Sequence, residues 1–293
     1  MRLVCEARKM SARGFVLLAP PQSHLVPFRE IVDDNSRHQR LLANAQRLRG
    51  EIYVRDGAIQ PWELSSGGRH IQRADALSWH LLTVDEREKV TSCIRYCAHR
   101  PGVSFSDLDI SQCAAAKSAE IGPNVREAIQ GELAYASQRG FYFVELGGWA
   151  ISEEIRCTSE ALRMLLTVFA LAQLMGGAVG LSTATTRHRS SSILKRVGGR
   201  PLMARGAVVP SYVDPRYNCE MELLTFDSTS PEAHYDKWIR ECRAALLDLP
   251  VISQETPATN TLALLSLHQA LSHPDQPANS VANTSSQEEL KRV

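Results

Sequence analysis

The sequence predicts an α/β fold in which a central mixed sheet, mostly antiparallel, is flanked by helices. Residues 78–84 (SWHLLTV) and 89–96 (KVTSCIRY) are strand-like segments separated by a short polar link, which predicts an antiparallel hairpin. Residues 141–185 run in the order strand, loop, helix, strand. That order predicts two parallel strands joined by a crossover helix, because a parallel pair needs a long connection.

Composition and charge set the class of protein. The chain has 293 residues, of which 44% are hydrophobic and 22% are charged, and such a chain can bury a sizeable core. The formal net charge is +1, so no global field favours nucleic acid or an anionic membrane. We therefore expect no nucleic-acid partner, and any basic site should be local.

No targeting or membrane segment is expected. The apolar run from Gly14 to Ala19 is shorter than the core of a signal peptide, which takes about 7–15 residues. The longest apolar stretch, residues 165–180, contains Gln173 and falls short of the ~20 residues of a membrane span. The sequence therefore predicts a cytoplasmic protein.

The seven cysteines are odd in number and scattered, and none forms a Cys-x-x-Cys pair. That pattern argues against both a disulfide framework and a zinc cage. Cys93, Cys97 and His99 can be read as metal ligands or as reduced thiols packed like small hydrophobic residues beside a histidine. We prefer the second interpretation and expect no metal.

Three regions are expected along the chain: an N-terminal extension of loose structure (1–35), a folded domain (36–252) and a polar, disordered tail (253–293). Ser, Thr, Asn, Gln and Pro dominate the tail, with one possible helical turn at 262–271. The remaining expected elements follow from periodicity and from Gly and Pro punctuation. They are helices at 37–49, 123–138, 161–175, 187–197 and 231–247, and strands at 51–54, 141–151, 178–185, 205–209 and 220–226.

The loop Arg156-Cys157-Thr158-Ser159-Glu160-Ala161 opens the crossover helix. The first turn of a helix presents N–H groups and a partial positive charge that suit a phosphate, and Arg156 adds a charge-assisted contact. The alternative is a plain helix start capped by Thr158 or Ser159.

The preceding strand carries Glu145, Gly147 and Gly148, followed by Trp149. A pair of strand glycines indicates either a bulge or the close approach of a ligand to the backbone. A carboxylate on this apolar strand is costly unless it is paired or used. Glu145 is therefore either a general base for an amine or the structural partner of an arginine, with Arg95 as the first candidate.

This order of elements resembles the GNAT superfamily of N-acyltransferases. Its phosphate loop has the pattern Gln/Arg-x-x-Gly-x-Gly/Ala, which Arg156 and Ala161 match while Ser159 replaces the middle glycine. The resemblance implies a GNAT fold whose parallel strands splay apart around a thioester arm. The donor would then be acyl-phosphopantetheine on an acyl carrier protein, or acyl-CoA. Its contacts would be Gly147, Gly148, Trp149, Arg156, Thr158, Ser159, Glu160 and Ala161.

Within that superfamily the chain is most similar to acyl-homoserine-lactone synthases and long-chain N-acyl amino acid synthases. They share an Arg on the N-terminal helix, an acidic segment before the hairpin, an Arg ending the second hairpin strand and a Glu on the next strand. Matching positions here are Arg49 with Tyr53, Asp75 before the strand of Trp79, Arg95 and Glu145. The resemblance implies Glu145 and Arg95 as catalytic, and Arg49, Tyr53, Asp75 and Trp79 as substrate-binding.

Two departures narrow the expected function. Gly147-Gly148 stands where the lactone synthases have Ser-Arg, and Leu194 stands where many CoA-dependent relatives have a Tyr acid. We therefore expect fatty N-acyl transfer from acyl carrier protein to a free amine such as an amino acid. The alternatives are an acetyl-CoA-dependent N-acetyltransferase and a non-catalytic binding module of the same fold.

Three further segments have both a functional and a plain interpretation. The loop from Gly67 to His70 and the loop 212–217 (YVDPRY) either contact substrate or simply connect elements. His188 with Ser190 invites a hydrolase interpretation, but no Gly-x-Ser-x-Gly elbow is present. The serines there are expected to start a short helix.

Overall fold

The computed structural model describes residues 14–21, 23, 27–187 and 189–254 of the 293. These residues belong to one compact unit, Met1–Glu255. The predicted tail lies outside the described residues, except for its first two positions.

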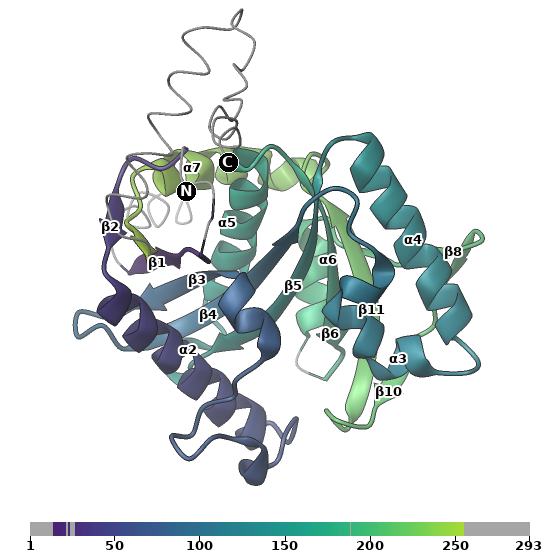
Figure 1. Ribbon diagram of the computed structural model, residues 1–293, viewed down its shortest axis with the longest axis horizontal. Coiled ribbons are helices and arrows are strands. Elements are labelled where there is room, and N and C mark those ends of the chain that lie inside the picture. Colours follow the sequence, from purple (N-terminus) through teal and green to yellow (C-terminus); the bar gives the residue numbers. More distant parts are fainter. Residues whose placement is uncertain (1–13, 22, 24–26, 188, 255–293) are drawn as a thin grey trace, which may run out of the picture. The chain divides into compact units, whose positions relative to one another are not determined.

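The described strands form a ten-stranded mixed sheet with the order β10-β11-β6-β5-β4-β3-β1-β12-β2, in which β7 pairs with β11 (Figure 1). A separate ribbon pairs β8 with β9. The bounds are β1 Phe15–Leu18, β2 Ile31–Asp33, β3 Trp79–Val84, β4 Val90–His99, β5 Tyr142–Ile151, β6 Ala178–Thr185, β7 Arg200–Pro201, β8 Met203–Ala204, β9 Ala207–Val208, β10 Tyr212–Asp214, β11 Cys219–Asp227 and β12 Val251–Ser253.

Helices cover both faces of this sheet (Figure 1). Buried contacts place α2, α3 and α4 on one face and α5, α6 and α7 on the other. The α-helices are α2 Asn35–Arg55, α3 Ala114–Lys117, α4 Gly122–Gln138, α5 Glu160–Leu174, α6 Ser190–Val197 and α7 Asp236–Leu247. The short 3-10 helices are η1 Pro61–Glu63, η2 Arg73–Leu77, η3 Phe105–Asp107, η4 Asp109–Gln112, η5 Glu153–Ile155 and η6 Ala233–Tyr235.

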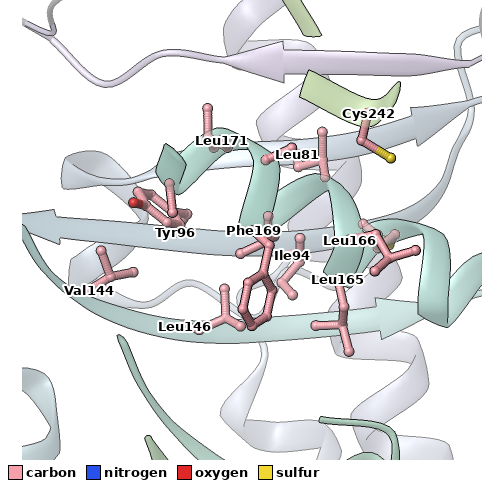
Figure 2. Packing of buried hydrophobic residues seen from close by; sticks show 14 of the residues in the cluster. Leu81, Ile94, Tyr96, Val144, Leu146, Leu165, Leu166, Phe169, Leu171 and Cys242 are labelled. Carbon is pink, nitrogen blue, oxygen red and sulfur yellow. The ribbon is translucent and has the colours of Figure 1, made fainter. Parts of the chain in front are cut away.

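The larger core lies between the sheet and α5. Residues alternate across a strand, so Ile94 and Tyr96 of β4 face α5 together with Val144 and Leu146 of β5 (Figure 2). Phe169 of α5 packs onto this layer. The alternate positions of β4 and β5 face α2, α3 and α4 instead, and they carry the polar side chains described below.

The predicted hairpin, the parallel pair and the crossover helix are all confirmed. Strands β3 and β4 pair antiparallel, and β5 pairs with β6 parallel through α5. The β5–β6 pairing runs from Tyr142↔Ala178 to Leu146↔Ser182. Both strands continue beyond that point, β5 to Ile151 and β6 to Thr185. The two parallel strands therefore part at their carboxyl ends, as the GNAT-like interpretation expects.

Three expectations were wrong. Residues 51–54 are the last turn of α2 rather than a strand, because Leu48 and Ile52 continue the buried helical stripe one turn further. Residues 15–18 and 31–33 are strands rather than loose chain, and Leu17 is fully buried in the main core. Residues 205–209 supply only the two-residue strand β9.

No helix in the described residues is long and apolar enough to cross a membrane.

Candidate functional site

Polar side chains gather on the sheet face under α2, along adjacent rows of β4 and β5. Arg95 lies opposite Gly147, and Cys97 lies opposite Glu145 in the next row. The pairing shifts register between Cys93 and Arg95, where Gly148 and Trp149 of β5 oppose a single residue of β4. This is a β-bulge, and it lies just past the point where β5 leaves β6.

Asp75 of η2 is the centre of a buried ion cluster. Arg49 of α2 donates from Nη1 to Asp75 Oδ1 (3.0 Å) and from Nη2 to Asp75 Oδ2 (2.6 Å). Arg95 donates from Nη1 to the same Oδ1 (3.2 Å) and to Gln72 Oε1 (2.8 Å). Gln46 of α2 donates to Asp75 Oδ2 as well. Two of the predicted substrate-binding residues, Arg49 and Asp75, thus meet the predicted catalytic Arg95.

The cluster carries a net positive charge, since two arginines share one carboxylate. Burial and the nearby charge of Arg49 together lower the pKa of His70 to about 4. Burial likewise lowers the pKa of His80 to about 4, despite the hydrogen bond to the Asp75 carbonyl. Both imidazoles are therefore neutral near pH 7, and the charge of the cluster is set by the two arginines and Asp75.

The glycine pair makes room for these arginines. A Cβ at Gly148 would lie 2.7 Å from Arg49 Nη1, and a Cβ at Gly147 would lie 3.4 Å from Arg95 Nη2. Gly148 also has a φ of +61°, in the left-handed region that favours glycine. The bulge interpretation is therefore confirmed for Gly148, and the groups that approach the two glycines are guanidinium groups of the protein itself. Contact between this backbone and a ligand stays a prediction.

Gly148→Ala is expected to lower the free energy of unfolding by about 2–3 kcal/mol, because it adds left-handed strain and crowds a buried guanidinium. The matched control is Gly131→Ala in α4, where the glycine is exposed and an added Cβ meets nothing within 4 Å. That change should stabilise the helix by about 0.5–1 kcal/mol. Chemical denaturation of both variants measures the opposite signs, and equal effects would contradict this account of Gly148.

Glu145 is paired with a histidine and not with Arg95. Its Oε2 lies 2.9 Å from His99 Nε2, and it accepts hydrogen bonds from the backbone N–H groups of Asp109 (3.0 Å, to Oε2) and Ile110 (2.7 Å, to Oε1). The expectation of an Arg95 partner was wrong because η2 brings Asp75 to Arg95 first. A long contact of 3.7 Å between Arg95 Nη2 and Asp109 Oδ2 links the two clusters.

The pKa of His99 is raised to about 10. Burial pulls it down, but the hydrogen bonds to the Cys97 and Glu145 side chains outweigh burial. His99 is therefore a cation at neutral pH, facing the carboxylate of Glu145.

The stability that His99 contributes should depend on pH in one direction. Its folded pKa lies above the unfolded value of about 6.5, so the stabilisation is complete below pH 6.5 and disappears as the pH rises to about 10. Urea unfolding of the wild type and of His99→Asn across this range should show the difference between them shrinking by on the order of 3 kcal/mol. A constant difference would mean that His99 is neutral in the folded state.

At the start of α5, Thr158 makes the hydroxyl-to-backbone bond that the plain capped-helix interpretation expects, and the phosphate contact stays a prediction. Arg156 donates from Nη2 to Asp56 Oδ2 at 2.6 Å, which anchors the loop to the end of α2. Thr158 Oγ1 accepts from Glu160 N (3.2 Å), whereas the cap residue Ser159 makes no side-chain capping bond. Glu160 turns its carboxylate inward to the hydroxyls of Thr83 and Ser92, both at 2.9 Å.

Tyr53 joins the site and Trp79 does not. The Tyr53 ring lies edge-on to Tyr217, at a centroid distance of 6.3 Å, and its hydroxyl donates to the carbonyl of Trp149 (3.4 Å). Residues 212–214 of the expected loop are strand β10, and Tyr217, which follows it, is the residue that contacts Tyr53. Trp79 lies on the opposite face, in the core beside Phe28.

Solved structures identify the fold. A CoA-dependent acyl-homoserine lactone synthase, BjaI, solved with SAM and isopentyl-CoA, superposes with a TM-score of 0.50 at 15% identity, over 87% of this chain and 100% of that one. The chain has the GNAT acyltransferase fold. FeeM, an N-acyl amino acid synthase from uncultured soil microbes, gives a TM-score of 0.42 at 14% identity, over 68% of this chain and 96% of that one. No protein-family model matches the sequence, and no curated protein matches it.

Within this GNAT fold, sequence reasoning missed three polar residues next to the proposed site. His99 and Cys97 were interpreted as packed residues, and Asp109 lies in a segment without a motif. One signal pointed to the first two: residues 95, 97 and 99 share one face of a strand because side chains alternate. Cys93, the third residue of the metal alternative, lies at the bulge, where its thiol faces the Gly148 carbonyl.

Proposed function

We propose that this chain is an N-acyltransferase that moves a fatty acyl group from the thioester of an acyl carrier protein to a free amine such as an amino acid. The observation that carries this proposal is the end of the β5–β6 pairing at Leu146↔Ser182 while both strands run on. Two strands that part in this way leave backbone N–H groups near Gly147 and Gly148 for a thioester carbonyl.

The donor's phosphate would bind at the start of α5. Backbone N–H groups at a helix N-terminus attract a phosphate, and Arg156 lies beside them, fixed by Asp56. Glu160 would oppose a phosphate only if its carboxylate pointed outward, and it is instead bonded to Thr83 and Ser92. The residues present therefore fit a phosphopantetheine phosphate or that of CoA.

The acceptor's carboxylate would bind Arg95 rather than Arg49. Both terminal nitrogens of Arg49 already donate to Asp75. Arg95 Nη2 lies over Gly147 at the bulge, and its one close carboxylate is the partly exposed Asp109, 3.7 Å away. An acceptor held there would have its amine near Glu145, one row along the strand.

In a direct transfer the amine attacks the donor thioester itself. This reaction needs a group that takes a proton from the amine. Glu145 or a water that it holds would do this. A carboxylate has about four lone-pair positions, and hydrogen bonds from His99, Asp109 and Ile110 use three of them. The acceptor would therefore have to reach the remaining one.

Product analysis tests the proposed function. The purified protein would be incubated with acyl carrier protein or CoA carrying chains of two to about sixteen carbons, together with a mixture of amino acids, and the released thiol and N-acyl products would be measured. Fatty amides formed from the carrier-protein donor support the proposal. Acetyl-CoA as the preferred donor would favour an N-acetyltransferase, and no thiol release with any donor would favour a binding module.

A further inference from the structure

We propose that Asp109 selects the acceptor by binding its ammonium group, while the acceptor's carboxylate lies on the free side of Arg95. The acceptor is then an α-amino acid, in which both charged groups are attached to one carbon. This inference rests on the proposed N-acyl transfer and deepens it, because it names a residue that distinguishes such an acceptor from other amines.

Arg95 has one occupied side and one free side. Nη1 donates to Asp75 Oδ1 and to Gln72 Oε1. Nε is buried without a hydrogen-bond partner among the described residues, and Nη2 donates no hydrogen bond to them. Nε and Nη2 together form the side of a guanidinium that binds a carboxylate through two parallel hydrogen bonds. A buried donor without a partner is costly, so the free side of Arg95 favours a bound anion.

The free side of Arg95 faces a place that no side chain fills. Arg95 lies opposite Gly147, which is partly exposed. Apart from the chain neighbours of Gly147, the described residues offer a Cβ at this position only one atom within 4 Å, which is Arg95 Nη2 at 3.4 Å. Gly147 also follows Leu146, the last residue of β5 that pairs with β6. A small molecule held over Gly147 would therefore lie next to the proposed thioester.

Asp109 brings a carboxylate to the same place without closing the free side of Arg95. Its backbone N–H binds Glu145 Oε2 at 3.0 Å, which fixes the residue at the start of η4. Its Oδ2 lies 3.7 Å from Arg95 Nη2, which is longer than a hydrogen bond. The side chain is 48% exposed, and its carboxylate accepts no hydrogen bond from the part of the chain that the structure describes. This carboxylate can therefore receive a cation from solution.

These positions match the two ends of one small molecule. Because Asp109 Oδ2 is close to Arg95 Nη2, a carboxylate on the free side of Arg95 would hold an ammonium group on the adjacent carbon near Asp109. The same ammonium would lie beside Glu145, whose carboxylate is bound to the Asp109 backbone. Glu145 is the residue proposed to take the proton of the amine, so this mode of binding would bring the amine to its base.

The charges of the two clusters support a ligand with one charge of each sign. The two arginines share only Asp75, which leaves one positive charge. Among the described residues, the neighbouring cluster holds the cation His99 and the carboxylates of Glu145 and Asp109, which leaves one negative charge. A carboxylate on the first cluster and an ammonium on the second would compensate both. An amine without a carboxylate would leave the arginines unbalanced.

Kinetics of thiol release at saturating acyl donor test the inference. The acceptors would be α-amino acids and the primary amines that have the same side chains but no carboxylate. The wild type should acylate the amino acids and not these amines. Asp109→Asn keeps the size of the side chain and the N–H that binds Glu145. It should raise the KM for the amino acid by about 10-fold, with kcat and the KM for the donor little changed.

A competing ligand separates recognition from a structural role. The hydroxy acid with the same side chain carries a carboxylate but no ammonium, so its inhibition constant should be the same for the wild type and Asp109→Asn. The matched control is Asp107→Asn in η3, whose carboxylate is bound to Ser104 instead, and this variant should behave like the wild type throughout.

Each other result would overturn a definite part of the proposal. An unchanged KM for the amino acid in folded Asp109→Asn would overturn the role of Asp109 and leave N-acyl transfer standing. Equal weakening of the amino acid and the hydroxy acid would mean that Asp109 only holds η4 in place, and would also overturn it. Equal use of the simple amines by the wild type would overturn the α-amino acid as acceptor. No thiol release by the wild type with any acceptor would overturn the proposed function as well.

Discussion

Replacing Asp75 by Asn is expected to lower the free energy of unfolding by about 3–5 kcal/mol, the usual effect of removing one partner from a buried ion cluster. Asp75 is 4% exposed and binds Arg49, which is 2% exposed, and Arg95, which is 7% exposed. The variant leaves two buried guanidinium groups facing an amide that cannot neutralise them. Chemical denaturation would measure the change.

The stability that Asp75 contributes should depend on pH. Burial raises the pKa of Asp75, but the hydrogen bonds and the positive charge of Arg49 outweigh burial. The net shift of the pKa is therefore downward. A carboxyl with a lowered folded pKa contributes its full stability above the unfolded value of about 3.9 and loses it as the pH falls through the folded pKa. The difference between wild type and Asp75→Asn should therefore be largest at neutral pH and shrink below about pH 4.

Asp248→Asn is the matched control. Asp248 pairs with Arg29 at 2.7 Å, but both side chains are more than 60% exposed. An exposed pair contributes about 0–1 kcal/mol, so this variant should unfold almost like the wild type. If Asp75→Asn behaved like Asp248→Asn, the buried cluster would not hold η2 against the sheet.

Helices and strands could be predicted from the sequence wherever apolar periodicity and the Gly and Pro positions agreed with the final pairing and packing. The crossover helix and the parallel strands on either side of it were placed within a residue or two, because apolar periodicity and the terminating Gly176-Gly177 coincide there. The strands β1 and β12 could not be predicted. Each is only three or four residues long. They become strands because β1 pairs with β12 and with β3, both far away in the sequence.

The site shows the same limit. The arginines and Asp75 could be located because the resemblance supplied their order along the chain. Their partners could not be assigned, because pairing depends on where loops bring backbone groups. Glu145 bonds to His99 and to the start of η4, which is a consequence of how residues 100–112 return to the sheet. Strand alternation alone could have grouped Cys97 with His99, but it could not show that Glu145 completes the group.

Glu145→Gln is expected to reduce the rate of acyl transfer by about 10²–10⁴-fold in a folded protein. The amide retains an oxygen for one backbone N–H of η4, but it cannot accept a proton or balance the charge of His99. The effect should appear in kcat, with the KM for the acyl donor little changed, because the donor would bind mainly at Gly147, Gly148 and the start of α5.

Two comparisons separate catalysis from structure in that result. Glu127 of α4 forms an exposed ion pair with Arg205. Glu127→Gln removes this carboxylate and should keep full activity. His99→Gln leaves the Glu145 carboxylate in place but removes the imidazole. If Glu145 is the base of a direct transfer, His99→Gln should retain much of the activity. If Glu145 instead acts by orienting His99, both variants should lose activity alike. A fully active, folded Glu145→Gln protein would limit Glu145 to holding η4 on the sheet.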